Sequence, residues 1–274
     1  MSEVIVAGGF DDLRFRQVRF LEEAAKLGPV HVLLWSDEAV RAAEGMACKF
    51  PQDERLYLLG AIRYVNRVTL SPDRMDRDTL PLLEWPRPDL WVVEPGRDTP
   101  ARRAWCRAQG MECRALRPED LQGLPEIPPL PTEPTPHKRK KVVVTGCYDW
   151  FHSGHVRFFE EVADLGDLYV IVGHDENIRL LKGQGHPMFP DLERWYMVQA
   201  VRYVKQAVIS TGHGWMDGEP EFLRIRPDIY AVNEDGDRPE KREFCARRGI
   251  EYRVLNRLPK QGLPRRESTE LRGF

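Results

Sequence analysis

The chain has 274 residues, a formal net charge of −2, 42% hydrophobic residues and 31% charged residues. This length suits two small domains or one large one, and the near-neutral charge argues against a general nucleic-acid-binding surface. No apolar run approaches the length of a membrane span, the N-terminus lacks a signal-peptide layout, and the five cysteines are scattered without C-x-x-C spacing. We therefore expect a cytoplasmic protein with reduced thiols.

The chain opens with a short apolar run at residues 4–6, and a glycine pair, Gly8 and Gly9, follows it. Residues 13–27 place apolar side chains at helical spacing and end at Gly28, and residues 30–35 form a second apolar run. This pattern predicts a strand, a tight turn, an amphipathic helix and a second strand.

The same unit recurs in the second half of the chain. Ala7 falls on Thr145, an offset of 138 residues, and Gly8 then falls on Gly146. Further on the offset becomes 139 residues, and the match continues without gaps. It pairs Glu54-Arg55 with Glu193-Arg194, Arg63-Tyr64-Val65 with Arg202-Tyr203-Val204, Arg87-Pro88-Asp89 with Arg226-Pro227-Asp228, and Cys106 with Cys245. Agreement over so many positions indicates a tandem duplication of one α/β unit, so we expect domains at residues 1–123 and 142–274.

Between the two copies lies a linker at residues 124–141. Its first part is dense in proline, which favours an extended polyproline-II spacer, and residues 137–141 form a basic run. A docking motif or a nuclear signal is the alternative interpretation of these two stretches.

The second copy begins with the most informative stretch of the chain. Residues 142–144 form a buried-strand pattern, Gly146 allows a close turn, and His152-Ser153-Gly154-His155 precedes a helical pattern over residues 156–165. Free backbone N–H groups, the positive end of a helix and two imidazoles would then converge on one place. That combination suits a phosphate group.

The rest of the second copy alternates strands and helices. The predicted strands lie at residues 168–173, 207–209, 229–232 and 252–255, and the predicted helices at residues 194–204, 219–224 and 239–248. This alternation predicts an α/β fold with a parallel sheet and helices on both faces. Ligands of such sheets bind beyond the carboxyl ends of the strands, where the strand order reverses.

The two copies differ most at the predicted phosphate site. His152-Ser153-Gly154-His155 aligns with Arg14-Phe15-Arg16-Gln17, and Lys182-Gly183 aligns with Glu44-Gly45, so a cation becomes an anion. The apolar pattern, in contrast, is kept in both copies. We therefore expect the second copy to carry the chemistry and the first copy to be degenerate and structural.

Several ordered motifs of the second copy resemble one known family. The His152-to-His155 motif resembles the signature of the cytidylyltransferase-like nucleotidyltransferases, and residues 179–183 resemble their lysine loop. Residues 192–194, 202–204 and 266–272 are similar to their Glu-Arg, Arg-Tyr-Val and C-terminal Ser/Thr-rich segments. The tandem layout is similar to that of the ethanolamine-phosphate cytidylyltransferases, in which the second copy is the eroded one. The resemblance implies two tandem Rossmann-like domains.

The resemblance also implies a reaction and a set of site residues. A substrate phosphate would attack the α-phosphorus of a nucleoside triphosphate that carries Mg²⁺, and pyrophosphate would leave, with no metal held by the protein alone. The implied catalytic residues are His152, His155, Lys182 and Arg194. The implied nucleotide-binding residues are Thr145, Gly146, Cys147, Tyr148, Asp149, Gly154, Asn233, Asp235, Arg257, Ser268 and Thr269, with Arg265 or Arg266 as alternatives to Arg257. The implied substrate-binding residues are Lys182, Trp150 and Trp195.

The leading functional hypothesis is cytidylyl transfer from CTP to a small phosphorylated alcohol or sugar, without a nucleic-acid partner. The motifs do not choose the base, so ATP-dependent adenylyl transfer is the first alternative. Glu267, an anion where the family has serine, motivates a second alternative, a nucleotide-binding pseudoenzyme. A class I aminoacyl-tRNA synthetase is excluded because the chain has no anticodon-binding region and no lysine-rich second signature. By analogy with dimeric single-copy relatives, we expect the two copies to pack as an intrachain pseudo-dimer.

Overall fold

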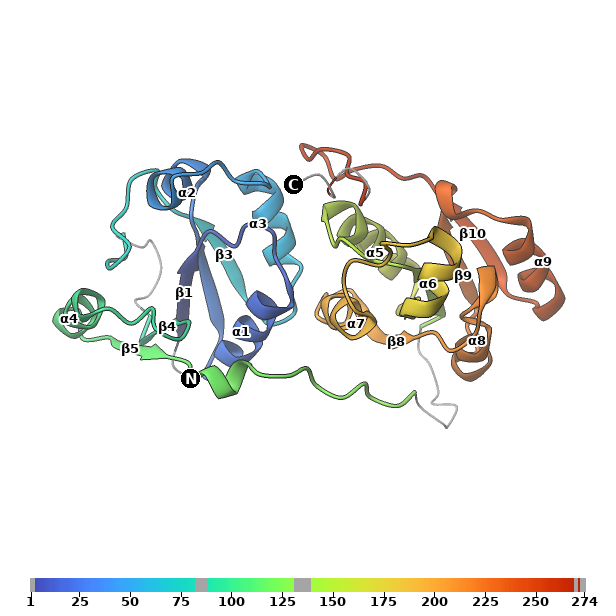
Figure 1. The fold of residues 1–274 in the computed structure, drawn as a ribbon, viewed down its shortest axis with the longest axis horizontal. Helices are drawn as coiled ribbons and strands as arrows, with labels where there is room; N and C mark the ends of the chain where they lie inside the picture. Colours follow the sequence, from blue (N-terminus) through green and yellow to red (C-terminus); the bar gives the residue numbers. More distant parts are fainter. Residues whose placement is uncertain (1–2, 82–87, 131–138, 269–270, 272–274) are drawn as a thin grey trace. The chain divides into compact units, whose positions relative to one another are not determined.

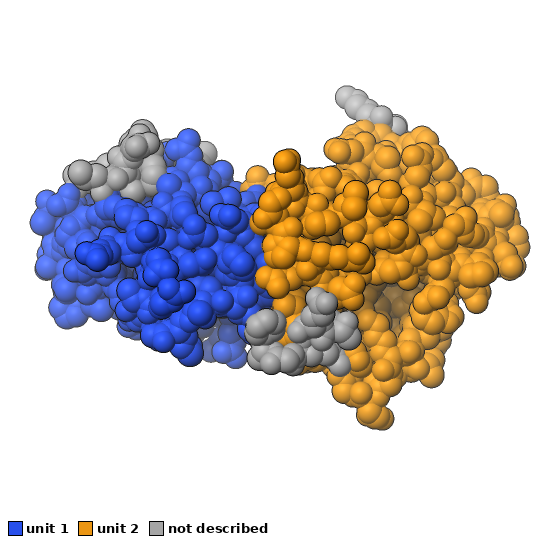
Figure 2. All heavy atoms as spheres, turned by 90° about the horizontal axis from the view of Figure 1, so that it is seen from above, with its two compact units in different colours: residues 1–123 blue, residues 124–274 orange. Residues whose placement is uncertain are grey.

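The computed structural model describes residues 3–81, 88–130, 139–268 and 271. It divides into two compact units, residues 1–123 and residues 124–274, which Figure 2 shows in blue and orange. Thr269, the first two residues of the basic run and the end of the proline-rich stretch lie outside the described residues.

The first unit is one parallel sheet with the strand order β3-β2-β1-β4-β5 (Figure 1). Its elements in chain order are β1 (Val4–Gly8), α1 (Phe15–Ala25), β2 (Val30–Leu34), α2 (Asp37–Glu44), α3 (Gln52–Gly60), β3 (Arg67–Leu70), β4 (Leu90–Val93), α4 (Pro100–Ala108), β5 (Glu112–Ala115) and the short helix η1 (Pro118–Leu121).

The second unit repeats this arrangement with the order β8-β7-β6-β9-β10 (Figure 1). Its elements are β6 (Lys141–Gly146), α5 (Ser153–Leu165), β7 (Asp167–Val172), α6 (Asp175–Lys182), α7 (Asp191–Gln199), β8 (Val204–Ile209), η2 (Gly214–Met216), α8 (Glu219–Ile225), β9 (Ile229–Asn233), η3 (Glu234–Gly236), α9 (Pro239–Arg248) and β10 (Glu251–Leu255). The expected fold class, two tandem Rossmann-like α/β domains, is confirmed.

The central strand β6 shows why a site forms at one edge of the sheet. Val142, Val143 and Val144 are fully buried, as expected for a parallel strand covered on both faces. Along its whole length β6 pairs with β7, but it pairs with β9 only at Val142 and Val143. The carboxyl end of β6 therefore separates from β9, and this opens a crevice where the strand order reverses.

Two boundaries differ from the sequence expectation. The helix expected over residues 194–204 is α7 (Asp191–Gln199), and Val204 already begins β8. Lys182 does not lie on a loop: it is the last residue of α6, where Asp175 and Glu176 in the first turn and the positive φ of 85° at Gly183 favour a short helix that ends there.

The start of the linker docks on the second unit. Leu130 packs against the core beneath β7 and β9, and the Gln206 side chain donates to the carbonyls of Pro128 and Pro129 at 2.9 and 3.2 Å. These contacts fix residues 128–130 beside strand β8. Within the described residues, no helix has the length and apolar character needed to cross a membrane.

Candidate active site

A pocket of about 490 Å³ lies beyond the carboxyl ends of β6 and β9 in the second unit. It brings together most of the residues that the sequence predicts for the site. These are Thr145, Gly146, Cys147, Tyr148, Asp149, Gly154, His155, Lys182, Asn233, Asp235, Arg257 and Ser268. The pocket is therefore where the fold predicts ligand binding, at the switch point of the sheet.

The turn after β6 is shaped by Gly146 and Tyr148. Tyr148 has a φ of +54°, which is uncommon for a residue with a side chain, and its ring is buried. A Cβ on Gly146 would lie 2.7 Å from that ring, so only glycine fits there. Phe10, the counterpart of Tyr148 in the first unit, has a similar φ of +47°. The strained turn thus belongs to the fold of both units.

His152 and His155 form the N-terminal cap of α5. The Nδ1 atom of His152 accepts the backbone N–H of Gly154 at 3.1 Å, and Nδ1 of His155 accepts the backbone N–H of His152 at 3.4 Å. The two rings stack with 4.0 Å between their centroids. Because each Nδ1 is an acceptor, the proton of each neutral imidazole lies on Nε2, which leaves two N–H donors for a ligand.

Both histidines are neutral at pH 7. Burial lowers the pKa of His152 to about 3, assisted by the positive charges of Arg257 and Arg266. Burial also places the pKa of His155 well below its usual value, with further lowering from His152, Arg257 and Lys182. Nε2 of His152 is buried without a hydrogen-bond partner among the described residues. An unpaired buried donor costs about 1–3 kcal/mol, so a ligand oxygen at this atom would be favoured.

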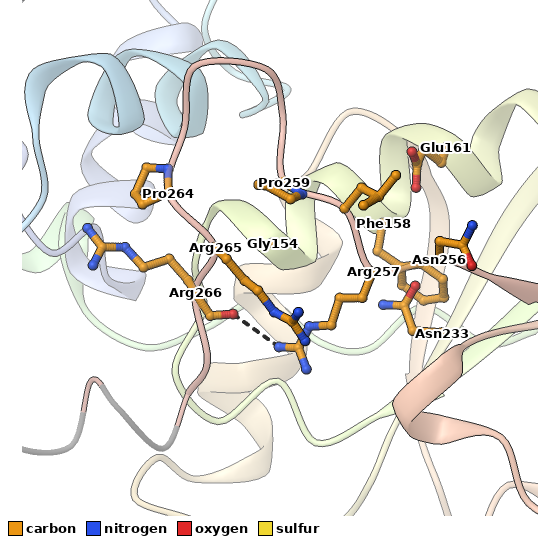
Figure 3. Close-up of a pocket in the computed structure, with 11 residues that line it drawn as sticks. Gly154, Phe158, Glu161, Asn233, Asn256, Arg257, Pro259, Pro264, Arg265 and Arg266 are labelled. Atoms are coloured by element: carbon orange, nitrogen blue, oxygen red, sulfur yellow. Dashed lines mark hydrogen bonds between the residues drawn. The ribbon is translucent and has the colours of Figure 1, made fainter.

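Two further cations face the pocket. Lys182 has no ion-pair partner among the described residues, and it lines the pocket from the end of α6. Arg257, just after β10, pairs with Asp235 and donates to the carbonyl of Arg266 at 3.1 Å (Figure 3). Of the three arginines weighed from the sequence, the structure therefore brings Arg257 to the site.

Arg194 does not face the pocket. Its guanidinium is buried, with 1% of the side chain exposed, and it is surrounded by acceptors. It donates to the carbonyls of Phe189, Cys147 and Gly173 and forms a 2.7 Å ion pair with Asp175. These bonds tie α7 to the turn after β6 and to the start of α6.

The first unit contains the same cluster around Arg55. This guanidinium is fully buried, donates to the carbonyls of Phe50, Gly9 and Trp35, and forms a 2.7 Å ion pair with Asp37. Every partner is the repeat counterpart of a partner in the second unit. Since the first unit lacks the histidines and the lysine, this arrangement serves the fold, and the expectation that Arg194 contacts phosphate is replaced by a positioning role.

Asp149 has a comparable structural role at the pocket wall. Its carboxylate accepts the backbone N–H groups of residues 188 and 189 at 2.7 and 3.1 Å. In the first unit, Asp11 accepts the N–H groups of residues 49 and 50 at 2.7 and 2.9 Å. The carboxylate therefore anchors the segment that leads into the following helix in both units.

Comparison with known proteins supports the assignment that this geometry suggests. The family model described as cytidylyltransferase-like matches residues 143–238. A FAD synthase of Archaeoglobus profundus is 34% identical over 134 residues, which cover 48% of this chain and 83% of that protein. The chain belongs to the cytidylyltransferase-like family. It is therefore a nucleotidyltransferase.

Two other relatives are also similar in sequence to part of this chain. A FAD synthase of Thermococcus kodakarensis is 38% identical over 127 residues, covering 44% of this chain and 83% of that protein. The bifunctional protein HldE of Methylococcus capsulatus is 38% identical over 95 residues, covering 34% of this chain and 20% of that protein.

The first unit shows which features of the cytidylyltransferase-like pocket are dispensable for folding. At the start of α1, the Gln17 side chain accepts the backbone N–H of Arg14 at 3.0 Å, as His155 does at the start of α5. The helix cap is thus kept without histidine. What the first unit lacks is the pair of imidazole Nε2 donors and the cation of Lys182, which becomes Glu44.

The tryptophans expected in the substrate site lie elsewhere. Trp195 is 1% exposed, and its indole donates to the carbonyl of Ala207 at 2.9 Å within the core. Trp150 packs edge-on against Phe189 and does not line the pocket. Trp215, half exposed on η2, does line it. The sequence offered no pattern that separated these three tryptophans.

Arg238 and Lys241 are pocket residues that the sequence reasoning missed. Arg238 stacks over the ring of Trp215 at 4.9 Å. Lys241 is 8% exposed, burial lowers its pKa, and it donates to the carbonyl of Gly236 at 3.0 Å. Lys241 therefore holds the turn that carries Asp235. The repeat offered a signal for Lys241, because its counterpart in the first copy, Arg102, is also a cation.

The C-terminal motif is described in part. The Ser268 hydroxyl donates to the carbonyl of Trp150 at 3.3 Å and lines the pocket, whereas Thr269 lies outside the described residues. Glu267 lies 3.6 Å from Arg265, which offsets its negative charge near the pocket.

The lowered pKa of His152 predicts a pH-dependent stability. A histidine that is neutral in the folded state binds fewer protons than in the unfolded state, so the free energy of unfolding should fall as pH drops below about 6.5, by up to about 1.4 kcal/mol per pH unit. His152→Asn keeps an N-cap acceptor and removes the titrating ring. Urea unfolding at pH 7 and pH 5 measures how much the free energy of unfolding falls on acidification, and this fall should be smaller in the variant.

His31 in the first unit, whose pKa burial lowers to about 4, also lowers the free energy of unfolding at acid pH, and it does so equally in the wild type and the variant. Equal falls in the wild type and the variant would contradict the prediction.

Proposed function

We propose that the second unit transfers a nucleotidyl group from a nucleoside triphosphate carrying Mg²⁺ to a small phosphate ester, with release of pyrophosphate. One observation carries this proposal: Arg257, the neutral His155 and Lys182, which has no ion-pair partner among the described residues, line one pocket at the N-terminus of α5, and the neutral His152 lies beside His155 in the helix cap. This set neutralises and holds a polyphosphate. It contains no strong general base, and an anionic phosphate nucleophile does not need one.

The reaction forms a bond between an acceptor phosphate oxygen and the α-phosphorus, and it breaks the bond between that phosphorus and the β-phosphate bridging oxygen. His152 and His155 would donate to phosphate oxygens as negative charge develops on them. Lys182 would bridge the triphosphate and the incoming phosphate, and this brings the reactants together. Arg257 and Ser268 would bind the departing β- and γ-phosphates. Mg²⁺ would arrive with the triphosphate; among the described residues, no group of three His, Cys, Asp or Glu side chains is placed to hold a metal ion.

For the donor, we propose ATP, and for the acceptor class an aromatic or sugar-like phosphomonoester, with FMN as the first compound to test. The relatives named FAD synthase support this choice, because FAD is FMN joined to AMP. The second candidate is CTP with a phosphorylated alcohol or sugar. The cytidylyltransferase-like description of the matching family model supports that candidate.

Pyrophosphate release across a panel tests the proposal. ATP and CTP are each combined with FMN, phosphoethanolamine, glycerol 3-phosphate and a sugar phosphate, and released pyrophosphate is measured. We expect one donor, ATP, to support turnover, and Lys182→Ala to lower kcat/KM by about 100-fold through loss of a phosphate contact. Arg179→Ala, on the same helix but outside the pocket, is the matched control. Triphosphate binding without pyrophosphate from any pair would instead support a pseudoenzyme.

We propose a non-catalytic, degenerate role for residues 1–123, with residues 142–274 as the catalytic domain and the intervening segment as linker. We further propose that the two units pack as an intrachain pseudo-dimer. The repeated strand order supports this, because identical folds provide equivalent surfaces. An experimental structure in which the two units do not touch would contradict the pseudo-dimer.

A further inference from the structure

The first unit contains a cavity of its own. It has a volume of about 640 Å³, and it lies beyond the carboxyl ends of β1 and β4. Strand β1 pairs with β4 only at Val4 and Ile5, so the same crevice opens here. The fold has therefore kept a ligand-sized space in the unit that lost the catalytic residues.

This cavity lacks the residues that would bind a polyphosphate. Gln17 occupies the position of His155, and its oxygen is used by the helix cap. Glu44 occupies the position of Lys182 and lines the cavity. An anion at this position repels a triphosphate, so the cavity does not suit the ligand of the second unit.

Two exposed arginines line this cavity. Arg77 and Arg97 line the cavity, are exposed, and have no ion-pair partner among the described residues. Their counterparts in the second unit are uncharged, Met216 and Gly236. These two guanidinium groups therefore have no charged counterpart at the same repeat positions of the second unit.

The two arginines are held together by a third one. Arg102, 9% exposed, donates to the backbone carbonyls of both Arg77 and Arg97. Its guanidinium lies 4.6 Å over the ring of Trp91. Because one buried group bonds to both backbones, the segments that carry Arg77 and Arg97 are fixed relative to one another at the cavity.

The cavity also offers neutral contacts. Nε1 of Trp35 is buried without a hydrogen-bond partner among the described residues, and Trp35 lines the cavity in place of Gly173. Glu94 lines it in place of Asn233 and can accept from hydroxyl or amino groups. A fitting ligand therefore carries one anionic group and several hydrogen-bonding groups.

We propose that the first unit is a second binding site, specific for a phosphate monoester such as a nucleoside monophosphate, with Arg77 and Arg97 as its anion contacts. This site is separate from the catalytic pocket and does not depend on which reaction the second unit performs. It gives the degenerate copy a ligand-sensing function beside its structural one.

The test uses the full chain with the catalytic site disabled by His155→Gln and Lys182→Ala. Calorimetric titration with AMP, CMP and FMN, and with adenosine as the phosphate-free control, measures binding that remains. We expect a monophosphate to bind at one site per chain, and adenosine to bind at least tenfold more weakly. Adding Arg77→Ala and Arg97→Ala should weaken binding at least tenfold, whereas Arg74→Ala with Arg107→Ala, two exposed arginines outside the cavity, should leave it unchanged.

Trp35 supplies a second readout at the site itself. Binding should change the tryptophan fluorescence of the disabled chain, and Trp35→Phe should remove most of that change. Absence of monophosphate binding, or binding that both arginine pairs leave unchanged, would overturn the proposal. Either result would leave the pyrophosphate assay of the second unit unaffected.

Discussion

Replacing His155 with glutamine is expected to lower kcat by about 100- to 1,000-fold while the protein stays folded. Glutamine can accept the backbone N–H of residue 152, as Gln17 accepts that of Arg14 in the first unit. It cannot reproduce the neutral imidazole that lines the pocket and keeps an Nε2–H donor free of the helix cap. Loss of one such preorganised donor costs about 3–4 kcal/mol of transition-state stabilisation.

The His155→Ala variant provides the comparison. Alanine removes both the donor and the cap acceptor, so it should lose the same activity and, in addition, about 1 kcal/mol of stability. Turnover by single-turnover kinetics and unfolding by urea separate the two effects. If glutamine retained near-normal turnover, the histidine would be a cap residue and not a phosphate ligand.

Replacing Arg194 with alanine is expected to lower the stability of the second unit by about 3–5 kcal/mol. The substitution leaves the carbonyls of Phe189, Cys147 and Gly173 and the carboxylate of Asp175 without their buried cation. Arg55→Ala should destabilise the first unit by a similar amount, because its partners are equivalent.

Hydrogen exchange measured by mass spectrometry can assign each loss to its unit. The Arg194 variant should lose protection in α6, α7 and the segment between them, and the Arg55 variant in α2, α3 and their connection. An Arg194 variant that keeps normal protection but loses activity would contradict the positioning role. It would restore the direct phosphate contact expected from the sequence.

The duplication made much of the fold predictable. The offset between the copies showed that one α/β unit occurs twice, and the apolar runs located the central strands. The position of Lys182 was not predictable, because the short helix α6 has only two buried residues, Asn177 and Ile178, and ends at a glycine that also suits a loop. Packing against neighbouring elements, which sequence periodicity does not show, decides between helix and loop there.

The sequence identified most of the residues that form the site, but it did not identify the role of each one. The motif located His152, His155 and Lys182, and the structure places them around one pocket or at its helix cap. Arg194 was misinterpreted because a buried guanidinium and a phosphate-binding one look alike in sequence. Its counterpart Arg55 was the available signal, since a residue kept in the copy without the histidines points to a role in the fold.

The transfer of an α-phosphate label tests the central claim most directly. The protein is incubated with Mg²⁺, FMN and ATP labelled at the α-phosphorus, and the products are separated. We predict that the label enters a product containing the acceptor, that one pyrophosphate is released per labelled product, and that His155→Gln lowers the rate of both by about 100- to 1,000-fold. The same experiment is run with labelled CTP and with each of the other acceptors. If the label stays in the triphosphate or appears only in the free nucleoside monophosphate in every combination, the result would contradict nucleotidyl transfer by this pocket.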